Sequence, residues 1–206
     1  MKKVILHLCA DIGSDSRPYD LDPDYEVIRV GENVGVQNFS AKGMKVQGII
    51  ANPVCTEFST ATGFDKVRDL DLGMFLVKHC QRIIKESNPV WWVIENPAKG
   101  RLKDILGKPK ATYQPWHFGS PWTKATALWG NFTMPEKVYS KWEDVPKNEN
   151  LYIRPTRKKP GLAFCHKSAI EFIPEFEWAK PYIKNDADFR SLCSQGFAEA
   201  FKKSNP

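Results

Sequence analysis

Short apolar segments alternate with polar turns along the first hundred residues of the chain. The segments Val4–Ala10, Tyr25–Val30, Val46–Ala51 and Val90–Ile94 are each apolar, and each is followed by turn-forming residues. Short buried runs of this kind are typical of strands that are covered on both faces of a parallel sheet. Between the third and fourth runs, residues 65–87 place apolar side chains near helical spacing. The pattern predicts an α/β fold with a mostly parallel, Rossmann-like sheet.

The second half of the chain is less periodic. Several tryptophans lie among prolines and lysines there, and residues 154–160 form a basic segment flanked by prolines. The final stretch, Phe189–Lys203, has the apolar spacing of a short amphipathic helix. We therefore expect a small, basic, Trp-rich C-terminal region that ends in a helix.

Composition and charge narrow the class of protein. The 206 residues are 42% apolar and 26% charged, which is ordinary for one globular domain. The absence of a long apolar run and of a secretory signal favours a cytoplasmic protein that makes no membrane contact. Residues 1–100 carry a net charge of −1 and residues 101–206 a net charge of +7, so a polyanion such as nucleic acid is a candidate partner. Ordinary solubilising charge explains the same numbers.

The five cysteines contain no C-x-x-C pair, which argues against a disulfide framework and a zinc ribbon. The adjacent pairs His79-Cys80 and Cys165-His166 point their side chains apart, so we expect no metal site. Only Cys55 follows a predicted buried strand directly, after Pro53. It is either a nucleophile that faces a cleft or a small buried apolar residue, and its position alone does not decide between them.

Polar residues follow each of the predicted strands. In parallel sheets ligands bind outside the carboxyl ends of the strands, so these residues are expected to share one rim. At the first two strand ends, Gly13 fits a cofactor loop or an ordinary turn, and Glu32 fits a ribose-binding carboxylate or a solvated acid. At the fourth, Glu95 and Asn96 precede a proline.

Four segments resemble motifs of the cytosine-5 DNA methyltransferase family, in the family's order. Residues 53–59, Pro-Val-Cys-Thr-Glu-Phe-Ser, are similar to its Pro-Pro-Cys-Gln-x-Phe-Ser motif, and residues 95–97, Glu-Asn-Pro, to its Glu-Asn-Val motif. Residues 8–14 resemble its cofactor loop, and residues 119–126 stand in the place of its Gln-x-Arg-x-Arg segment. The C-terminal helix is similar to the end of short, phage-type members, which suggests a bacterial or phage-infected cell.

This resemblance implies a mechanism. Cys55 would attack carbon 6 of a flipped-out cytosine, and carbon 5 would then take the methyl group of S-adenosylmethionine. Glu95 would hold the ring at N3 and the exocyclic amine, Asn96 would shape that loop, and Lys124 would support the O2 side. The resemblance also implies a set of cofactor-binding residues, namely Cys9, Ala10, Asp11, Ile12, Gly13, Glu32 and Pro53.

The resemblance also suggests a division of the chain. Residues 1–130 would form the catalytic domain, residues 131–188 a reduced target-recognition or cap region, and residues 189–206 a helix that packs back on the catalytic domain. The chain departs from the family at Asp11, which replaces a glycine, and in lacking an adenine-contacting Asp near residues 35–37. These departures leave open a nucleic-acid-binding protein without methyl transfer. The small size of the region between residues 131 and 188 leaves open the same chemistry on RNA or a free cytosine nucleotide.

Overall fold

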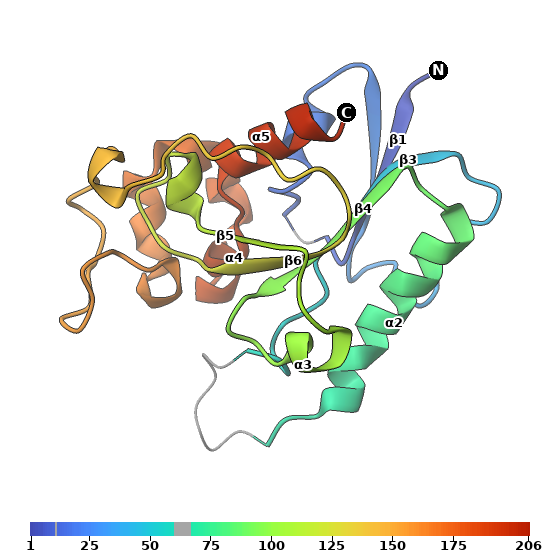
Figure 1. Ribbon diagram of the computed structural model, residues 1–206, viewed down its shortest axis with the longest axis horizontal. Helices are drawn as coiled ribbons and strands as arrows, with labels where there is room; N and C mark the ends of the chain where they lie inside the picture. Colours follow the sequence, from blue (N-terminus) through green and yellow to red (C-terminus); the bar gives the residue numbers. More distant parts are fainter. Residues whose placement is uncertain (11, 60–66) are drawn as a thin grey trace.

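The computed structural model describes residues 1–10, 12–59 and 67–206, and it has an α/β fold built on one sheet (Figure 1). In those residues the sheet has six strands in the order β2-β1-β3-β4-β6-β5. The strands are β1 Lys3–Leu8, β2 Tyr25–Val30, β3 Val46–Ala51, β4 Trp91–Pro97, β5 Ala111–Tyr113 and β6 Thr126–Asn131. β1 to β4 are mutually parallel, and β6 is antiparallel to both of its neighbours. The predicted α/β fold with a mostly parallel sheet is confirmed.

The helices are mostly short. The α-helices are α1 Arg17–Asp20, α2 Leu70–Ser87, α3 Leu102–Leu106, α4 Asp186–Ser191 and α5 Gln195–Ser204. The 3-10 segments are η1 Pro115–Phe118, η2 Trp142–Asp144, η3 Leu162–Phe164, η4 Lys167–Phe172 and η5 Pro174–Tyr182. Within the described part of the chain, no helix is both long enough and apolar enough to cross a bilayer.

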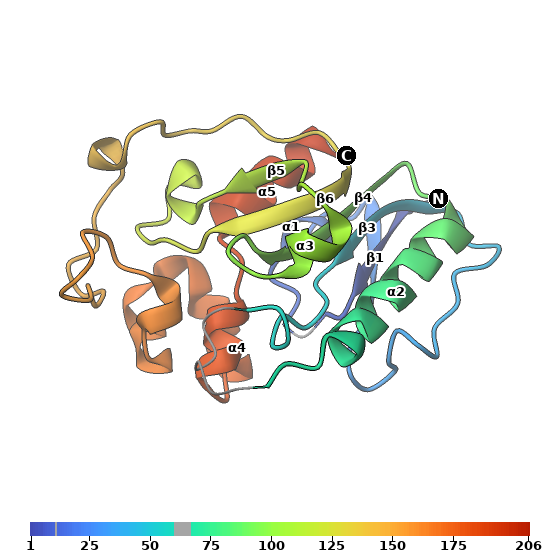
Figure 2. The same ribbon diagram turned by 60° about the horizontal axis from the view of Figure 1, so that its bottom comes forward.

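The two faces of the sheet are covered by different helices (Figure 2). α2 packs on one face through Val77, Cys80 and Ile83. α5 packs on the other through Phe197 and Phe201, and α1 lies beside α5 on the same side. Because successive side chains of a strand point to opposite faces, each central strand contributes to both cores, which accounts for the uninterrupted apolar runs in the sequence.

The sequence places the start of α2 too early. The helix begins at Leu70, because Asp69 is its N-cap and accepts a hydrogen bond from the Leu72 backbone N–H at 2.9 Å. Residues 65 and 66 of the predicted helix lie outside the described residues. The predicted end is correct, since Asn88 adopts a left-handed conformation after Ser87.

The end of β4 was also predicted too early. Glu95, Asn96 and Pro97 continue the strand, because β6 supplies an antiparallel partner from Thr126 to Leu128. The sequence analysis missed β6, whose partner β4 lies about thirty residues earlier in the chain. Since they are consecutive strand residues, Glu95 and Asn96 point to opposite faces of the sheet.

The predicted C-terminal helix is two helices. α4 ends at Ser191, and α5 begins after Ser194, whose hydroxyl accepts a hydrogen bond from the Phe197 backbone N–H at 3.2 Å. The segment between them is non-helical and buried. α4 joins the 3-10 segments around a third apolar cluster, which is separate from the two cores on the sheet and includes Trp122, Phe176 and Phe189.

Gly48 in β3 lies opposite Trp91 in β4, and the indole ring occupies the space where a Cβ at residue 48 would stand, at 2.1 Å. Tyr19 stacks on the same indole with ring centroids 5.7 Å apart, so the ring has little room to shift. We therefore expect Gly48→Ala to destabilise the fold by about 1–3 kcal/mol, as overpacking does. Urea denaturation would measure the loss.

The matched control is Gly161→Ala. There the nearest atom to a new Cβ, at 3.1 Å, belongs to the ring of Phe164, which is 40% exposed and able to turn. This variant should remain close to wild-type stability. Equal losses in the two variants would contradict the packing argument.

Candidate functional site

The candidate site lies at the topological switch point of the sheet, where the strand order reverses between β1 and β3. β1 stands between β2 and β3, so the connections that leave β1 and β3 run to opposite sides. A crevice opens outside the carboxyl ends of the strands at such a point, and ligands of α/β sheets bind there. The loops that follow β1 and β3 contain residues 9–13 and 53–55, which the sequence had placed at one rim.

His7, near the carboxyl end of β1, links these two loops. Its ring contacts the Ser16 hydroxyl at 2.8 Å through Nδ1 and the Asn52 side-chain oxygen at 3.0 Å through Nε2. Burial lowers the pKa of His7 and so keeps the ring neutral. A neutral imidazole donates from one ring nitrogen and accepts at the other, so donation from Nε2 to the Asn52 oxygen leaves Nδ1 as an acceptor facing the Ser16 hydroxyl. The sequence analysis did not single out His7, since it lies inside an apolar strand.

Cys55 sits in a turn whose far end is fixed in the core. The backbone N–H groups of Phe58 and Ser59 donate to the Cys55 carbonyl at 2.9 and 2.7 Å. The Phe58 side chain is fully buried, and its carbonyl accepts from the Arg101 backbone N–H at 2.8 Å. The thiol of Cys55 is half-buried. Of the two possibilities that the sequence left open, the structure places Cys55 outside the fully buried core.

Asn96 joins the strand of Glu95 to the loop of Cys55. Its side chain is fully buried, and Nδ2 donates to the Pro53 carbonyl at 3.0 Å. The Asn96 Oδ1 has no hydrogen-bond partner among the described residues. This contact sets the β4 end against the residue two positions before Cys55, so Asn96 has a positioning role in the geometry.

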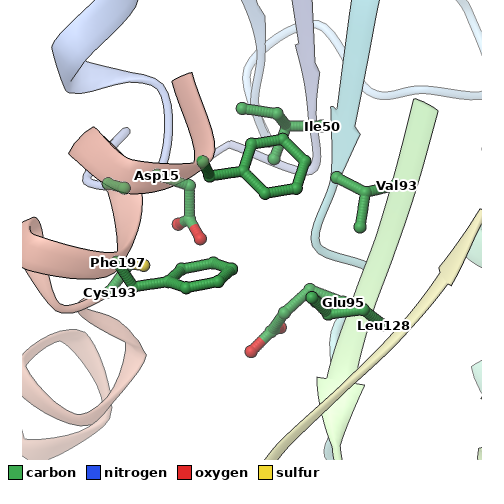
Figure 3. Close-up of a pocket in the computed structure, with 9 residues that line it drawn as sticks. Asp15, Ile50, Val93, Glu95, Leu128, Cys193 and Phe197 are labelled. Atoms are coloured by element: carbon green, nitrogen blue, oxygen red, sulfur yellow. The ribbon is translucent and has the colours of Figure 1, made fainter. Parts of the chain in front are cut away.

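Glu95 points to the other face of β4, toward α5. It borders a small pocket whose lining includes Asp15, Val93, Cys193 and Phe197 (Figure 3). Asp15 and Glu95 enter this pocket from separate elements. The free volume is about 20 Å³, enough for about one water molecule. Asp15 is a further acidic residue near the site that the sequence analysis did not select.

Lys124 completes the cluster. Its ammonium donates to the carbonyls of Ser191 at 2.8 Å and Leu192 at 3.1 Å, which lie at the end of α4. A lysine has three N–H donors, so one remains after these two bonds. Lys124 also acts on both Cys55 and Glu95, since its positive charge lowers the pKa of each.

The electrostatics of Cys55 and Glu95 are coupled. Burial raises the pKa of Glu95 to about 7, against the smaller opposing effect of Lys124, and Asp15 adds to the rise. Burial also raises the pKa of the Cys55 thiol, and the negative charge of Glu95 raises it further. A carboxyl group with a pKa near 7 exists in both protonation states at neutral pH, as an acid–base catalyst requires.

Four of the cofactor-binding residues predicted from the sequence lie in the loop after β1, and their surroundings differ. Gly13 has a φ of +80°, which by itself favours glycine, and a Cβ there would also lie 2.5 Å from the Arg29 Nε. Ala10 is buried and Ile12 packs on the third apolar cluster. Asp11 lies outside the described residues.

The remaining predicted cofactor residues lie around the same crevice. Cys9 is half-buried at the end of β1, and Pro53 is buried in the loop after β3. Glu32 is exposed just beyond β2, in the position where Rossmann-type units hold a ribose hydroxyl with a carboxylate. Gly31 lets β2 approach β1 closely, because a Cβ there would lie 2.6 Å from the Ala10 carbonyl oxygen. An exposed carboxylate at this position is able to accept hydrogen bonds from the hydroxyl groups of a ribose.

No protein-family model matches the chain, and no curated protein matches it in sequence. Among solved structures, it is similar to a crystal structure of a candidate DNA modification methyltransferase encoded within a prophage of E. coli. The TM-score is 0.49 and the sequence identity 16%, over 76% of this chain and 56% of that one. The chain thus spans just over half the length of the structure it matches.

The coupling of Cys55 to its two charged neighbours predicts a change in thiol reactivity. At pH 8 Glu95 is mostly ionised, so Glu95→Gln removes a negative charge, lowers the pKa of Cys55 and speeds its alkylation by iodoacetamide a few-fold. Lys124→Met removes a positive charge and should slow the same reaction. Peptide mass mapping of the alkylated protein measures the rate at Cys55 alone.

Glu32→Gln serves as the matched control, because it neutralises an exposed acid that is not among the causes of the Cys55 shift. Its alkylation rate should equal that of the wild type. The proposed electrostatic coupling is wrong if Glu95→Gln leaves the alkylation rate of Cys55 unchanged. It is also wrong if Glu95→Gln and Lys124→Met change that rate in the same direction.

Proposed function

We propose that this protein is a cytosine-5 methyltransferase that acts on DNA, with Cys55 as the nucleophile. The observation that carries the proposal is the convergence of a half-buried thiol, a carboxyl group of raised pKa and an ammonium group at the carboxyl end of a parallel sheet. The motif resemblance of residues 53–59 and 95–97 assigns the chemistry, and the geometry supports it by joining those segments through Asn96 and Pro53.

The role of Cys55 is to form a bond with carbon 6 of cytosine. The thiolate is the reactive form, and burial together with Glu95 disfavours it in the free protein. Protonation of Glu95 removes one of these obstacles, and Lys124 favours the thiolate. Attack at carbon 6 therefore proceeds best when Glu95 carries a proton.

Glu95 is then suited to give that proton to the ring. As the thiolate adds to carbon 6, negative charge moves onto the ring and N3 becomes more basic. A neutral carboxyl group beside N3 can donate its proton and so neutralise the charge. The pKa near 7 makes the protonated form available at physiological pH. The base would lie where it can reach both the Cys55 thiol and the Glu95 carboxyl group.

Asn96 and Lys124 hold the segments around Cys55 and Glu95 in place. Asn96 fixes the distance between the β4 end and the Cys55 loop through Pro53, and Lys124 ties the cluster to the end of α4. S-adenosylmethionine would supply an electrophilic methyl group when bound, with its ribose at Glu32. The loop of residues 9–13 would line the same crevice.

DNA is the proposed substrate because a basic surface adjoins the site. The basic loop, residues 154–159, is exposed over most of its length and leads directly into Pro160. The Pro160 carbonyl accepts from the Thr123 backbone N–H at 2.9 Å, which places the end of the loop beside Lys124. Arg154 lies over the ring of Phe164 with its guanidinium carbon 5.0 Å from the ring centroid.

An aromatic pair continues this basic surface. Trp116 and Trp142 meet edge to face with centroids 6.3 Å apart, and Lys159 lies over both rings at 4.7 and 5.1 Å. Both indoles are half-buried, so part of each is open to solvent. Cations beside partly open aromatic rings suit phosphate contacts and base stacking. We propose that residues 131–188 contribute target recognition through this surface.

The decisive experiment is covalent trapping on duplex DNA that contains 5-fluorocytosine, with S-adenosylmethionine present. The fluorine at carbon 5 cannot leave as a proton does, so a working enzyme stays attached to the base after the methyl transfer. We expect an adduct with the wild-type protein and none with Cys55→Ala. Denaturing electrophoresis measures the adduct, and circular dichroism shows whether the variant is folded.

Parallel substrates separate the alternatives. An adduct on RNA or on a free fluorinated nucleotide, with none on DNA, would show that the proposed mechanism is right but that DNA is not the substrate. Retained adduct formation in Cys55→Ala would disprove the proposed nucleophile. Absence of S-adenosylmethionine binding in a calorimetric titration, together with DNA binding, would leave a nucleic-acid-binding protein without methyl transfer.

The basic surface makes a separate prediction about DNA affinity. Arg154→Ala combined with Arg157→Ala removes two exposed charges of the basic loop, so DNA binding should weaken. The plot of log K against log salt concentration should also become shallower, its slope decreasing in magnitude by about 2. Fluorescence anisotropy over a range of salt concentrations measures both. Because these arginines lie outside the Cys55 cluster, the alkylation rate of Cys55 should stay unchanged.

Lys78→Ala combined with Lys85→Ala is the charge-matched control. Both lysines are exposed on α2, at the other end of the molecule from the basic loop (Figure 1). If this control reduces the salt slope as much as the loop variant does, binding follows net charge and not the basic loop.

A further inference from the structure

Two cysteines outside the proposed catalytic cluster lie in direct contact. Cys9, at the end of β1, and Cys80, on the buried side of α2, have their sulfur atoms 3.8 Å apart. The two residues come from different elements and are separated by 70 intervening positions. Neither thiol takes part in the chemistry proposed for Cys55.

The surroundings distinguish the two thiols. Cys9 is half-buried, whereas Cys80 is fully buried on the inner side of α2. The hydrogen bond with Cys9, together with burial, raises the pKa of the Cys80 thiol. Cys80 is therefore unreactive toward reagents in solution, and its accessible neighbour is the sulfur atom of Cys9.

Cys9 also has an unusual backbone conformation. Its φ is +54°, in the left-handed region that residues with a Cβ rarely adopt. This conformation directs the side chain of Cys9 toward the face that α2 covers, where it packs against the core. The distance between the two sulfur atoms is therefore only about 2 Å longer than the S–S bond of a disulfide.

We propose that Cys9 and Cys80 form a reversible dithiol–disulfide pair, a modification site that is separate from the nucleophile. The oxidant is a small disulfide. The Cys9 thiolate attacks one sulfur of the reagent and releases its first thiol, leaving a mixed disulfide. The Cys80 sulfur loses its proton and attacks the Cys9 sulfur, which releases the second thiol. The protein gives up two electrons and two protons, and the reagent takes them up.

The bond would fasten the end of β1 to α2. On the proposed function Cys9 borders the cofactor crevice, so oxidation would change cofactor binding there, and this consequence rests on that function. The formation of the disulfide itself does not, because it depends only on the two sulfur atoms and the accessibility of Cys9.

The test uses the full chain as the Cys55→Ala variant, which removes the other half-buried thiol. The protein is incubated with hydroxyethyl disulfide, and peptide mass mapping without reduction identifies the linked residues. We expect one crosslink, between the peptides of Cys9 and Cys80, that dithiothreitol reverses. The wild-type chain is mapped in the same way, so the result does not depend on how the variant folds.

Single variants test the order of the two steps. Cys80→Ala should keep the reagent attached to Cys9 as a mixed disulfide, and Cys9→Ser should leave Cys80 unmodified in the folded protein. Cys165→Ala, which removes another buried thiol, should leave the crosslink intact. The proposal is overturned if Cys9 keeps the reagent while Cys80 is present, or if both thiols stay free under conditions that modify Cys55 in the wild type. A lack of S-adenosylmethionine binding would count against the proposed function alone.

Discussion

The hydrogen bond from the Asn96 amide to the Pro53 carbonyl is the contact on which the site geometry depends. It is buried, and it joins the carboxyl ends of β3 and β4 just where the chain leaves the sheet. On either side of it lie the two groups that need a fixed separation, the Cys55 thiol and the Glu95 carboxyl. Hydrogen bonds removed from water are costly to break without replacement, so the two strand ends cannot drift apart. The site is therefore held by backbone and amide contacts and not by the reactive groups themselves.

The same strand geometry explains why Glu95 has a raised pKa. Because β4 runs on to Pro97, alternation sends Asn96 toward α2 and Glu95 toward α5. α5 covers that face with aromatic side chains, so Glu95 is partly buried beside them, and Lys124 offsets only part of the resulting rise in the pKa of Glu95. A strand that ended at Ile94 would have left Glu95 in a solvated loop with an ordinary pKa. The pairing of β6 with β4 thus determines the acid–base character of the site.

Local patterns in the sequence predicted the parallel part of the sheet well, since β2 and β3 have the predicted bounds. They did not predict β5 or β6, because β5 has only three residues and the antiparallel pairing of β6 with β4 and β5 is not encoded in a local period. The sequence placed Cys55 and Glu95 at one rim, from the order of strands and loops. It could not show that Asp15 borders the same pocket as Glu95, or that His7 joins Ser16 to Asn52, because those contacts depend on how the loops fold back. Gly13 has two explanations, a cofactor loop and an ordinary turn, and its φ of +80° is compatible with both.

The basic loop and the catalytic cluster are connected by a short path through the backbone. Thr123 pairs with Pro160 and Gly161 at the end of the loop, and the next residue is Lys124. Lys124 in turn holds the carbonyls at the end of α4, which belongs to the third apolar cluster together with Trp122. On the proposed function, a polyanion bound at the basic loop would therefore lie one residue along the chain from Lys124, whose positive charge lowers the pKa of Cys55.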